Sequence, residues 1–271
     1  MRRVHVGARV TDLAHLWPVL SRLVAFFRRS PLSTVAVCMF MVAAAWVTFN
    51  TRRWNHRELL QWDTDGYYLY LPAALIHGDP LHLGFLDSIP PGTFPKDYRF
   101  GQGAFPVERT GRYSNKYTMG VAVFELPFFL AAHAWCSVFS PAEADGYSPP
   151  YHLAVALASA FWPWLGLLVL MRFLRRYVSD AHAAIALLAL GLGTNLFFYS
   201  SFAGGMSHPF LFFLCALLIE RTDRWYTSPS LLRALVIGAC IGMATLTRPT
   251  CLLFALIPLC WRIRDDGTRL L

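Results

Sequence analysis

The sequence predicts an all-α fold, a polytopic transmembrane helical bundle of about seven spans with one large extracytoplasmic first loop. The first observation is composition, because 56% of the 271 residues are hydrophobic, 15% are charged and the mean hydropathy is +0.42. The second is that apolar residues gather in runs close to the roughly 20 residues that a membrane-spanning helix needs. The third is that the arginines concentrate in the amino-terminal segment and in turns, where orientation signals lie in membrane proteins. The net charge of +8 therefore does not indicate nucleic-acid binding.

Residues 1–30 form a basic segment ahead of the first apolar run. The segment carries six arginines against one acid, Asp12, and its apolar residues recur at helical spacing. This pattern predicts a cytoplasmic amphipathic segment over 1–30 and a transmembrane domain over 31–271. The first run, from Leu32 to Phe49, contains no charge and predicts an uncleaved signal anchor. A signal peptide cleaved near Ala43 to Ala45 is the alternative.

Residues from about 50 to 117 predict the large outer loop, because acids and bases occur together there with many Pro and Gly residues. Within the loop, residues 67–77 are apolar and aromatic but only half a span long, which suits a helix lying in the membrane interface. The stretch from Tyr98 to Tyr117 has aromatic residues punctuated by Gly and predicts a hairpin.

Six further apolar segments are expected to complete the bundle. They lie at about Met119–Phe139, His152–Met171, His182–Phe202, Pro209–Ile219, Leu231–Thr247 and Cys251–Trp261. Counting crossings from a cytoplasmic amino terminus puts the later arginine turns outside, whereas the positive-inside rule puts them inside. The conflict disappears if one segment before residue 171 does not cross, or if an extra crossing lies there. The segment at 119–139, interrupted by Glu125 and Pro127, is the best candidate, and His208 and Arg248 would then share the outer face with the loop.

Asp63 and Asp65, within the sequence WDTDGYY at residues 62–68, are the main candidates for catalysis. In an extended backbone, residues two apart point the same way, so the two carboxylates could hold a divalent cation, or one could act as a general base that the other orients. On a helix they would diverge. The alternative interpretation is that both residues cap the helix that follows.

Two further charged residues lie next to or inside an apolar segment. Lys116 precedes the second span at headgroup depth, where it could hold a lipid phosphate or serve as an anchor. Glu125 lies inside an apolar run, where a carboxylate usually faces a polar cavity or a partner.

Two breaks in helical structure each carry a group that can bind phosphate. His208 follows Gly204 and Gly205, and Arg248 lies between two apolar segments just before Pro249. Irregular backbone at membrane depth generally lines a cavity, and Arg binds phosphate through two parallel hydrogen bonds. A turn cation and a helix cap are the alternative roles.

Five short motifs follow one another between about residues 60 and 260. They are Asp65–Pro72 (DGYYLYLP), Asn115–Tyr117 with Pro127–Phe129, Asp145–Ser148 (DGYS), Met206–His208 and Arg248–Pro249. In this order, after a signal anchor, they resemble the GT-C superfamily of integral-membrane glycosyltransferases. That group includes protein O-mannosyltransferases and lipid A aminoarabinose transferases, and the chain looks most like an uncharacterised bacterial branch.

The resemblance implies transfer of a sugar, with inversion, from a polyprenyl-phosphate donor to a glycan, lipid or protein acceptor on the non-cytoplasmic face of a bacterial inner membrane. The family's first-loop carboxylate corresponds to Asp63 or Asp65, and Asp65 is preferred because it directly precedes the Gly-Tyr-Tyr match. Substrate binding is assigned to the remaining candidates: Lys116, Arg248, His208, Tyr67, Tyr68 and Glu125. Some members of the superfamily use a metal and others do not, so a divalent cation held by the two aspartates stays open.

Other interpretations remain beside the transferase. Relatives usually have more spans, so this chain is expected to be truncated at its carboxyl terminus. It could be a transferase remnant, or a non-catalytic membrane protein that binds a polyprenyl lipid. It could also be a transporter with a midplane polar cavity formed by Glu125, His208 and Arg248. The placement of charge favours the transferase, because the densest cluster of acids, bases and aromatic residues lies in the outer loop.

Overall fold

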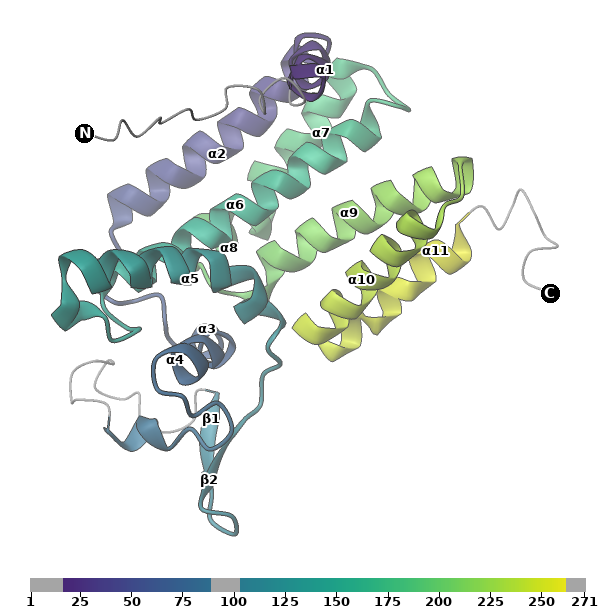
Figure 1. Ribbon diagram of the computed structural model, residues 1–271. Helices are drawn as coiled ribbons and strands as arrows, with labels where there is room; N and C mark the ends of the chain where they lie inside the picture. Colours follow the sequence, from purple (N-terminus) through teal and green to yellow (C-terminus); the bar gives the residue numbers. More distant parts are fainter. Residues whose placement is uncertain (1–16, 89–102, 262–271) are drawn as a thin grey trace, which may run out of the picture.

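The computed structural model describes residues 17–88 and 103–261 and is mostly helical. The long helices form a bundle, and a smaller group of loop elements lies at one end of it (Figure 1). The part of the basic segment at residues 1–16 lies outside the described residues. From Trp17 to Arg28 the segment forms helix α1, which leads into the bundle.

Three helices are long and apolar enough to cross a membrane: α2 (Pro31–Thr51), α5 (Gly120–Phe139) and α6 (Pro149–Leu174). A fourth span results if α7 (Asp180–Leu192) and α8 (Asn195–Ser201), which meet at a bend of 59°, count as one broken helix. These helices coincide with four of the expected apolar segments. The expectation of about seven spans is not supported, because the described residues supply three or four.

The other expected segments are helical but do not qualify as spans. Helix α9 (Ser207–Thr227) has 21 residues, yet four charged residues occupy positions 220–224. Helix α10 (Leu231–Thr247) has 17 residues, and η4 (Pro249–Ala255) with α11 (Leu256–Cys260) forms another short apolar stretch. A count of apolar runs overestimated the spans because it did not weigh helix length and charge together.

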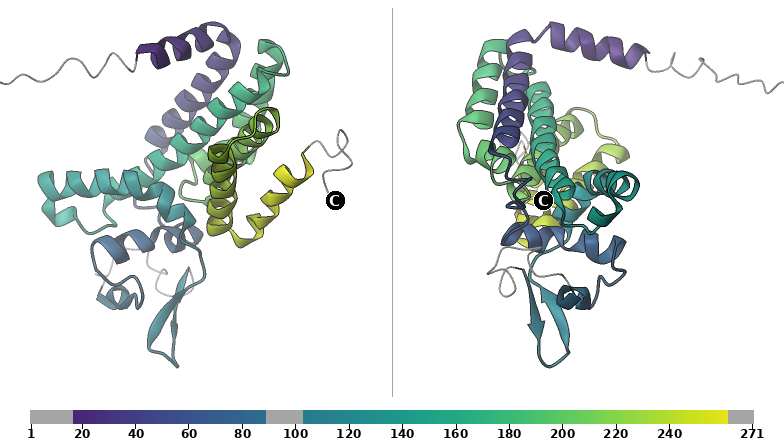
Figure 2. Two further views of the ribbon diagram at one scale, coloured as in Figure 1. Left: turned by 45° about the vertical axis from the view of Figure 1, so that its right-hand side comes forward. Right: turned by 90° about the vertical axis from the view of Figure 1, so that its left-hand side faces the viewer.

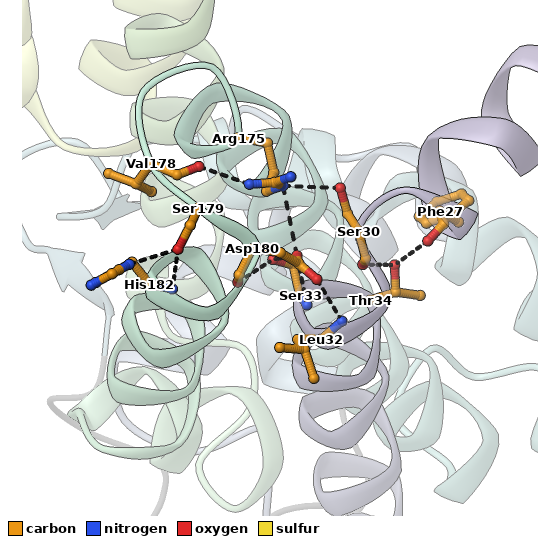
Figure 3. Close-up of polar contacts among 10 residues, drawn as sticks. All are labelled: Phe27, Ser30, Leu32, Ser33, Thr34, Arg175, Val178, Ser179, Asp180 and His182. Carbon is orange, nitrogen blue, oxygen red and sulfur yellow. Dashed lines mark hydrogen bonds and ion pairs between the residues drawn. The ribbon is translucent and has the colours of Figure 1, made fainter.

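The start of α2 is held by an aspartate from the start of α7 (Figure 3). The Asp180 carboxylate accepts hydrogen bonds from the backbone N–H groups of Leu32 (2.8 Å) and Ser33 (3.2 Å) and from the Ser33 hydroxyl (2.6 Å). Arg175 Nε donates to Ser30 Oγ at 3.0 Å and lies 3.6 Å from Asp180 Oδ1. The first N–H groups of a helix have no acceptor within that helix, and the Asp180 carboxylate is the acceptor for two of them in α2.

The outer loop contains short elements that pack beneath the bundle. They are α3 (Asp63–Tyr68), α4 (Tyr70–Leu75), η2 (Gly84–Ser88), β1 (Ala104–Val107) and β2 (Arg112–Asn115). The two strands pair antiparallel, with Ala104 opposite Asn115, which confirms the expected hairpin in the described part of that stretch. The helix expected over 67–77 is instead two short helices, and Tyr68 and Leu71 are buried against α5 and α6 while Leu75 is exposed.

Helix α5 lies across α2 and α6 rather than along them (Figures 1 and 2). Just before it, Tyr117 contacts Asp63 of α3. After α5 the chain passes through η3 (Pro141–Glu143) and returns to the same elements, where the Tyr68 hydroxyl donates to the Gly146 carbonyl at 2.5 Å. Both ends of α5 therefore lie at the loop-bearing end of the bundle.

The arginines of the α6–α7 turn and of the end of α9 lie together at the opposite end. Arg175 contacts Ser30 at the start of α2, and Arg176 Nη1 lies 2.9 Å from Asp223 Oδ2 near the end of α9. The α6–α7 turn, the end of α9 and the start of α2 therefore share one end. If α5 does not cross the membrane, the crossing count places these turns on the same side as the amino terminus, as the positive-inside rule requires.

Candidate functional site

Four segments that are distant in sequence meet at the loop-bearing end. They are the start of α3, residues 115–118 after β2, the turn between α8 and α9, and the end of α10. Glycines allow the close approach of two of them. A Cβ on Gly66 would lie 2.1 Å from Tyr117 Cδ2, and a Cβ on Gly205 would lie 2.1 Å from Thr64 Cγ2. The glycines near these motifs therefore serve to bring α3 against its neighbours.

Tyr117 connects the outer loop to Asp63. Its hydroxyl donates to Asp63 Oδ1, and its ring lies 4.5 Å from the Tyr67 ring, centroid to centroid. The Tyr70 hydroxyl donates to the Tyr117 carbonyl at 2.5 Å, and the Tyr117 N–H donates to Asn115 Oδ1 at 3.0 Å. Burial raises the pKa of the Tyr117 phenol, and the hydrogen bond and the charge of Asp63 raise it further. Tyr117 therefore stays protonated and orients the carboxylate.

Asp63 itself follows a residue with unusual backbone geometry. Trp62 has a φ of 54° and a ψ of −128°, and 66% of its surface is exposed. A bulky residue at positive φ is uncommon, and such conformations are enriched at functional sites. The half-buried Asp63 begins the helix directly after it.

The end of α10 brings Arg248 to the same place. The Thr118 hydroxyl donates to the Thr247 carbonyl at 3.1 Å, and a Cβ on Gly120 would lie 2.5 Å from Thr247 N. This contact brings Arg248 close enough for its charge to act on both Tyr117 and His208. Arg248 and His208 therefore lie at the same end of the bundle as the loop, in agreement with the sequence expectation.

His208 lies in the first turn of α9, outside the helices that qualify as spans. Its ring stacks on Tyr199, with centroids 4.3 Å apart. Burial lowers the pKa of His208, the charge of Arg248 lowers it further, and the charge of Asp63 opposes both. The imidazole is therefore neutral at pH 7 and can donate or accept a hydrogen bond beside Arg248 and Asp63.

His208 also lines a cavity of about 300 Å³. The lining is mainly apolar and comes from α7, α8, α9 and η4: Leu190, Thr194, Asn195, Leu196, His208, Leu211, Phe212, Cys215 and Phe254. The neutral His208 side chain thus lies between an apolar cavity and the opposite charges of Arg248 and Asp63. This arrangement can receive an amphipathic molecule, with the apolar part in the cavity and an anionic group toward Arg248.

Lys116 lies at the edge of this group of residues. Its side chain is exposed, and its ammonium nitrogen lies 4.8 Å from the centroid of the Tyr117 ring. A cation over the face of an aromatic ring is attracted to the ring electrons. Lys116 is therefore positioned near the site on the solvent side.

Asp65 and Glu125 belong to a different, interior group. Asp65 is 5% exposed and Glu125 is 1% exposed. Burial raises the pKa of Tyr68, and the charges of Tyr147, Glu125 and Asp65 add to the shift, so both carboxylates lie near this phenol. Tyr68 is itself fully buried and stacks near Phe129. The structure therefore separates Asp65, Glu125 and Tyr68 from Asp63, His208 and Arg248.

The extended backbone that would let Asp63 and Asp65 share a cation is not present. Both residues lie in the first turn of α3, and residues two apart on a helix point in different directions. Asp63 contacts Tyr117, whereas Asp65 lies near Tyr68. Within residues 17–88 and 103–261, three or more His, Cys, Asp or Glu side chains do not come together in a way that could hold a metal ion.

Two residues that position the site were not among its predicted residues, although Asp145 begins one of the five motifs. Nδ1 of the buried His152 accepts hydrogen bonds from the N–H groups of Leu59 and Leu60, at 3.3 Å each, just before α3. The Asp145 carboxylate accepts from the N–H groups of Tyr147 (2.8 Å) and Ser148 (2.7 Å) and shapes the turn into α6. The Asp-Gly-x-Ser pattern signals such a turn, whereas no local pattern predicts the contact of His152.

The fold and the site together define a helical membrane protein with a polar site at one end of its bundle. Comparisons of the chain with protein-family models, with curated proteins and with solved structures gave no match.

Proposed function

We propose that the protein is a membrane glycosyltransferase that moves a sugar from a polyprenyl-phosphate donor to an acceptor hydroxyl, with inversion at the anomeric carbon. The observation that carries this proposal is the convergence of Asp63, His208 and Arg248 beside an apolar cavity of about 300 Å³. A lipid-linked sugar phosphate has the matching parts, namely an apolar chain, an anionic phosphate and an electrophilic carbon. The resemblance of the ordered motifs to the GT-C superfamily supports the same reaction.

Asp63 is the proposed general base. Its carboxylate takes the proton from the acceptor hydroxyl as that oxygen attacks the anomeric carbon, while the bond from this carbon to the phosphate oxygen breaks. The sequence alone favoured Asp65 slightly, but the burial of Asp65 separates it from solvent and from Arg248. A half-buried carboxylate at the start of α3 is better placed to meet a substrate.

Arg248 and Lys116 are the proposed partners of the departing lipid phosphate. A guanidinium can donate two parallel hydrogen bonds to a phosphate, and cations near the developing negative charge stabilise the transition state. Neutral His208 supplies a further hydrogen bond between the charged groups and the cavity. Tyr67 supports the ring of Tyr117. Glu125, Asp65 and Tyr68 support the fold of α3 from the interior.

The orientation proposed for this reaction places the loop-bearing end on the outer face of a bacterial inner membrane and the amino terminus in the cytoplasm. The arginine turns that gather at the opposite end support this orientation. The acceptor is a glycan, a lipid or a protein exposed on the outer face.

The test is transfer of a labelled sugar from defined polyprenyl-phosphate donors by the full chain in lipid. We expect Asp63→Asn to lower the rate by on the order of a thousandfold or more, and Asp65→Asn to act mainly on stability. Thermal unfolding of both variants separates the two effects. If Asp63→Asn retains transfer while Asp65→Asn folds normally and loses it, the buried carboxylate is the base.

Donor binding without turnover in the unaltered chain would contradict the enzymatic proposal. It would instead support a lipid-binding protein or a transferase remnant. Flux of a solute across liposomes that requires Glu125 would support a transporter.

A further inference from the structure

A second group of charges lies at the opposite end of the bundle from the proposed catalytic site. It consists of Arg172 and Arg176 on α6 and its following turn, and of Glu220, Arg221, Asp223 and Arg224 on α9. We call these six residues the arginine cluster. Four guanidinium groups against two carboxylates leave an excess of positive charge.

The carboxylates of the arginine cluster are buried beneath the guanidinium groups. Glu220 and Asp223 are each 3% exposed. Arg176 bridges them, with Nη2 at 3.5 Å from Glu220 Oε1 and Nη1 at 2.9 Å from Asp223 Oδ2. Arg224 Nε lies 2.5 Å from Glu220 Oε1, and Arg221 Nε lies 3.4 Å from Glu220 Oε2. The acids thus hold three arginines in place from the inside.

The same three arginines keep part of their surface open to the outside. The side chains of Arg176, Arg221 and Arg224 are 31%, 37% and 35% exposed. Each guanidinium has five N–H groups in a rigid fork, and the ion pairs described above use only one or two of them. The outer N–H groups can therefore donate to an external anion.

Arg172 contributes charge without a matching acid. It is exposed, and the charges of Arg224, Arg221 and Arg176 act on it, opposed by the charge of Glu220 alone. Arg172 forms no ion pair with any residue in the ranges 17–88 and 103–261. Four like charges held this close favour an anion that lies between them.

Aromatic side chains of the kind found at membrane interfaces lie next to the cluster. Phe173 lies beside Tyr177, with ring centroids 5.2 Å apart, and beside Trp261 at 6.4 Å. Trp225 and Tyr226 follow Arg224 directly, with centroids 5.0 Å apart. Trp and Tyr concentrate at both interfaces of membrane proteins, because their rings are apolar and their polar atoms remain hydrated.

We infer that the arginine cluster binds the phosphate of an anionic phospholipid on the side of the membrane opposite to the proposed catalytic site. The Arg172, Arg221 and Arg224 side chains donate to the phosphate oxygens, and the neighbouring aromatic rings contact the upper part of the acyl chains. The buried Glu220 and Asp223 fix the positions of the guanidinium groups. Basic pockets between transmembrane helices recognise lipid headgroups in this way. The inference does not depend on the transferase proposal.

The test is titration of the purified full chain with phosphatidylglycerol or phosphatidylcholine of identical acyl chains, with bound lipid counted by native mass spectrometry. We expect phosphatidylglycerol to bind more tightly, and Arg172→Gln to weaken that binding about fivefold. Arg172→Lys keeps the positive charge and should weaken phosphatidylglycerol binding less than Arg172→Gln does. Arg28→Gln is the matched control, because Arg28 is also exposed at this end of the bundle but lies outside the arginine cluster.

Arg172→Gln should keep the thermal unfolding midpoint of the unaltered chain, since Arg172 forms no ion pair with the described residues. Equal binding of the two lipids would overturn the inference. An equal loss of phosphatidylglycerol binding in Arg28→Gln and Arg172→Gln would also overturn it. Complete displacement of phosphatidylglycerol by inorganic phosphate would show a site for free phosphate rather than for a lipid. Any of these results leaves the sugar-transfer test unaffected.

Discussion

Gly205 shows how a single residue positions the candidate site. Its φ is 85°, and a Cβ at this position would lie 2.1 Å from Thr64 Cγ2 and 2.9 Å from Val155 Cγ1. Its N–H donates to the Ser159 hydroxyl at 2.7 Å. The turn before α9 can therefore lie against α3 only with glycine here, and this contact brings His208 toward Asp63.

We expect Gly205→Ala to destabilise the fold by about 1–3 kcal/mol, because both the backbone conformation and the contact with Thr64 oppose a side chain. Thermal unfolding in detergent measures the effect. Gly238→Ala is the matched control, since a Cβ at Gly238 on α10 meets nothing within 4 Å. Alanine in the middle of a helix should be neutral or slightly stabilising there. Equal stability of the two variants would contradict the role given to Gly205.

At the scale of elements, the polar contacts at the ends of helices decide how the helices meet. Helix α2 has Ser30 at its N-cap position, but the Ser30 side chain makes no capping hydrogen bond. Asp180 of α7 accepts from the first N–H groups instead, and Arg175 approaches both residues (Figure 3). Because the carboxylate belongs to the first turn of α7 and accepts from the start of α2, the cap also fixes α2 against α7.

Asp180→Ala should lower the free energy of unfolding by about 0.5–2 kcal/mol, because the first N–H groups of α2 lose the side chain that caps them. Ser33→Ala removes only the hydroxyl bond of 2.6 Å and leaves the N–H bonds, so it should cost less. Chemical or thermal unfolding of the two variants in the same detergent compares them. A larger loss in Ser33→Ala would show that the N–H groups of α2 do not depend on Asp180.

At the scale of the whole molecule, the path of α5 determines which segments share a face. Helix α5 is long and apolar enough to span, yet the segments that precede and follow it both contact α3 of the outer loop. The arginines of the α6–α7 turn and of the end of α9 lie together at the end opposite the outer loop (Figure 2). If α5 does not cross the membrane, the α6–α7 turn and the end of α9 lie on the same side as the amino terminus, as the positive-inside rule requires.

This arrangement predicts the labelling pattern of single cysteines in sealed vesicles. In a background with the exposed Cys38 and Cys260 replaced by Ala, Arg112→Cys and Ala142→Cys should react with an impermeant thiol reagent from the same side. Ser228→Cys should react only from the other side, because it follows α9 at the arginine end. Reaction of Ala142→Cys from the side that labels Ser228→Cys would show that α5 crosses.

The sequence predicted the class of fold and the approximate position of every long helix. Apolar runs and their charged ends report directly on helices that avoid water, and this signal is local. The hairpin and the importance of the segments around Asp63, His208 and Arg248 also followed from local patterns of Gly, Pro and charge. The number of spans did not follow from the sequence, because an apolar run does not reveal whether its helix crosses the membrane or lies across other helices.

The tertiary structure alone decided which candidate residues meet. Asp63 and Asp65 differ by two positions, and only the helical geometry of α3 turns one toward Tyr117 and the other toward Tyr68. Tyr117, His208 and Arg248 come from segments separated by many residues, and the close approaches at Gly66, Gly120 and Gly205 bring them together. Local sequence determines which segments become helices, because hydrogen bonds and apolar spacing act over a few residues. The side chains that share a site are decided by packing between distant segments.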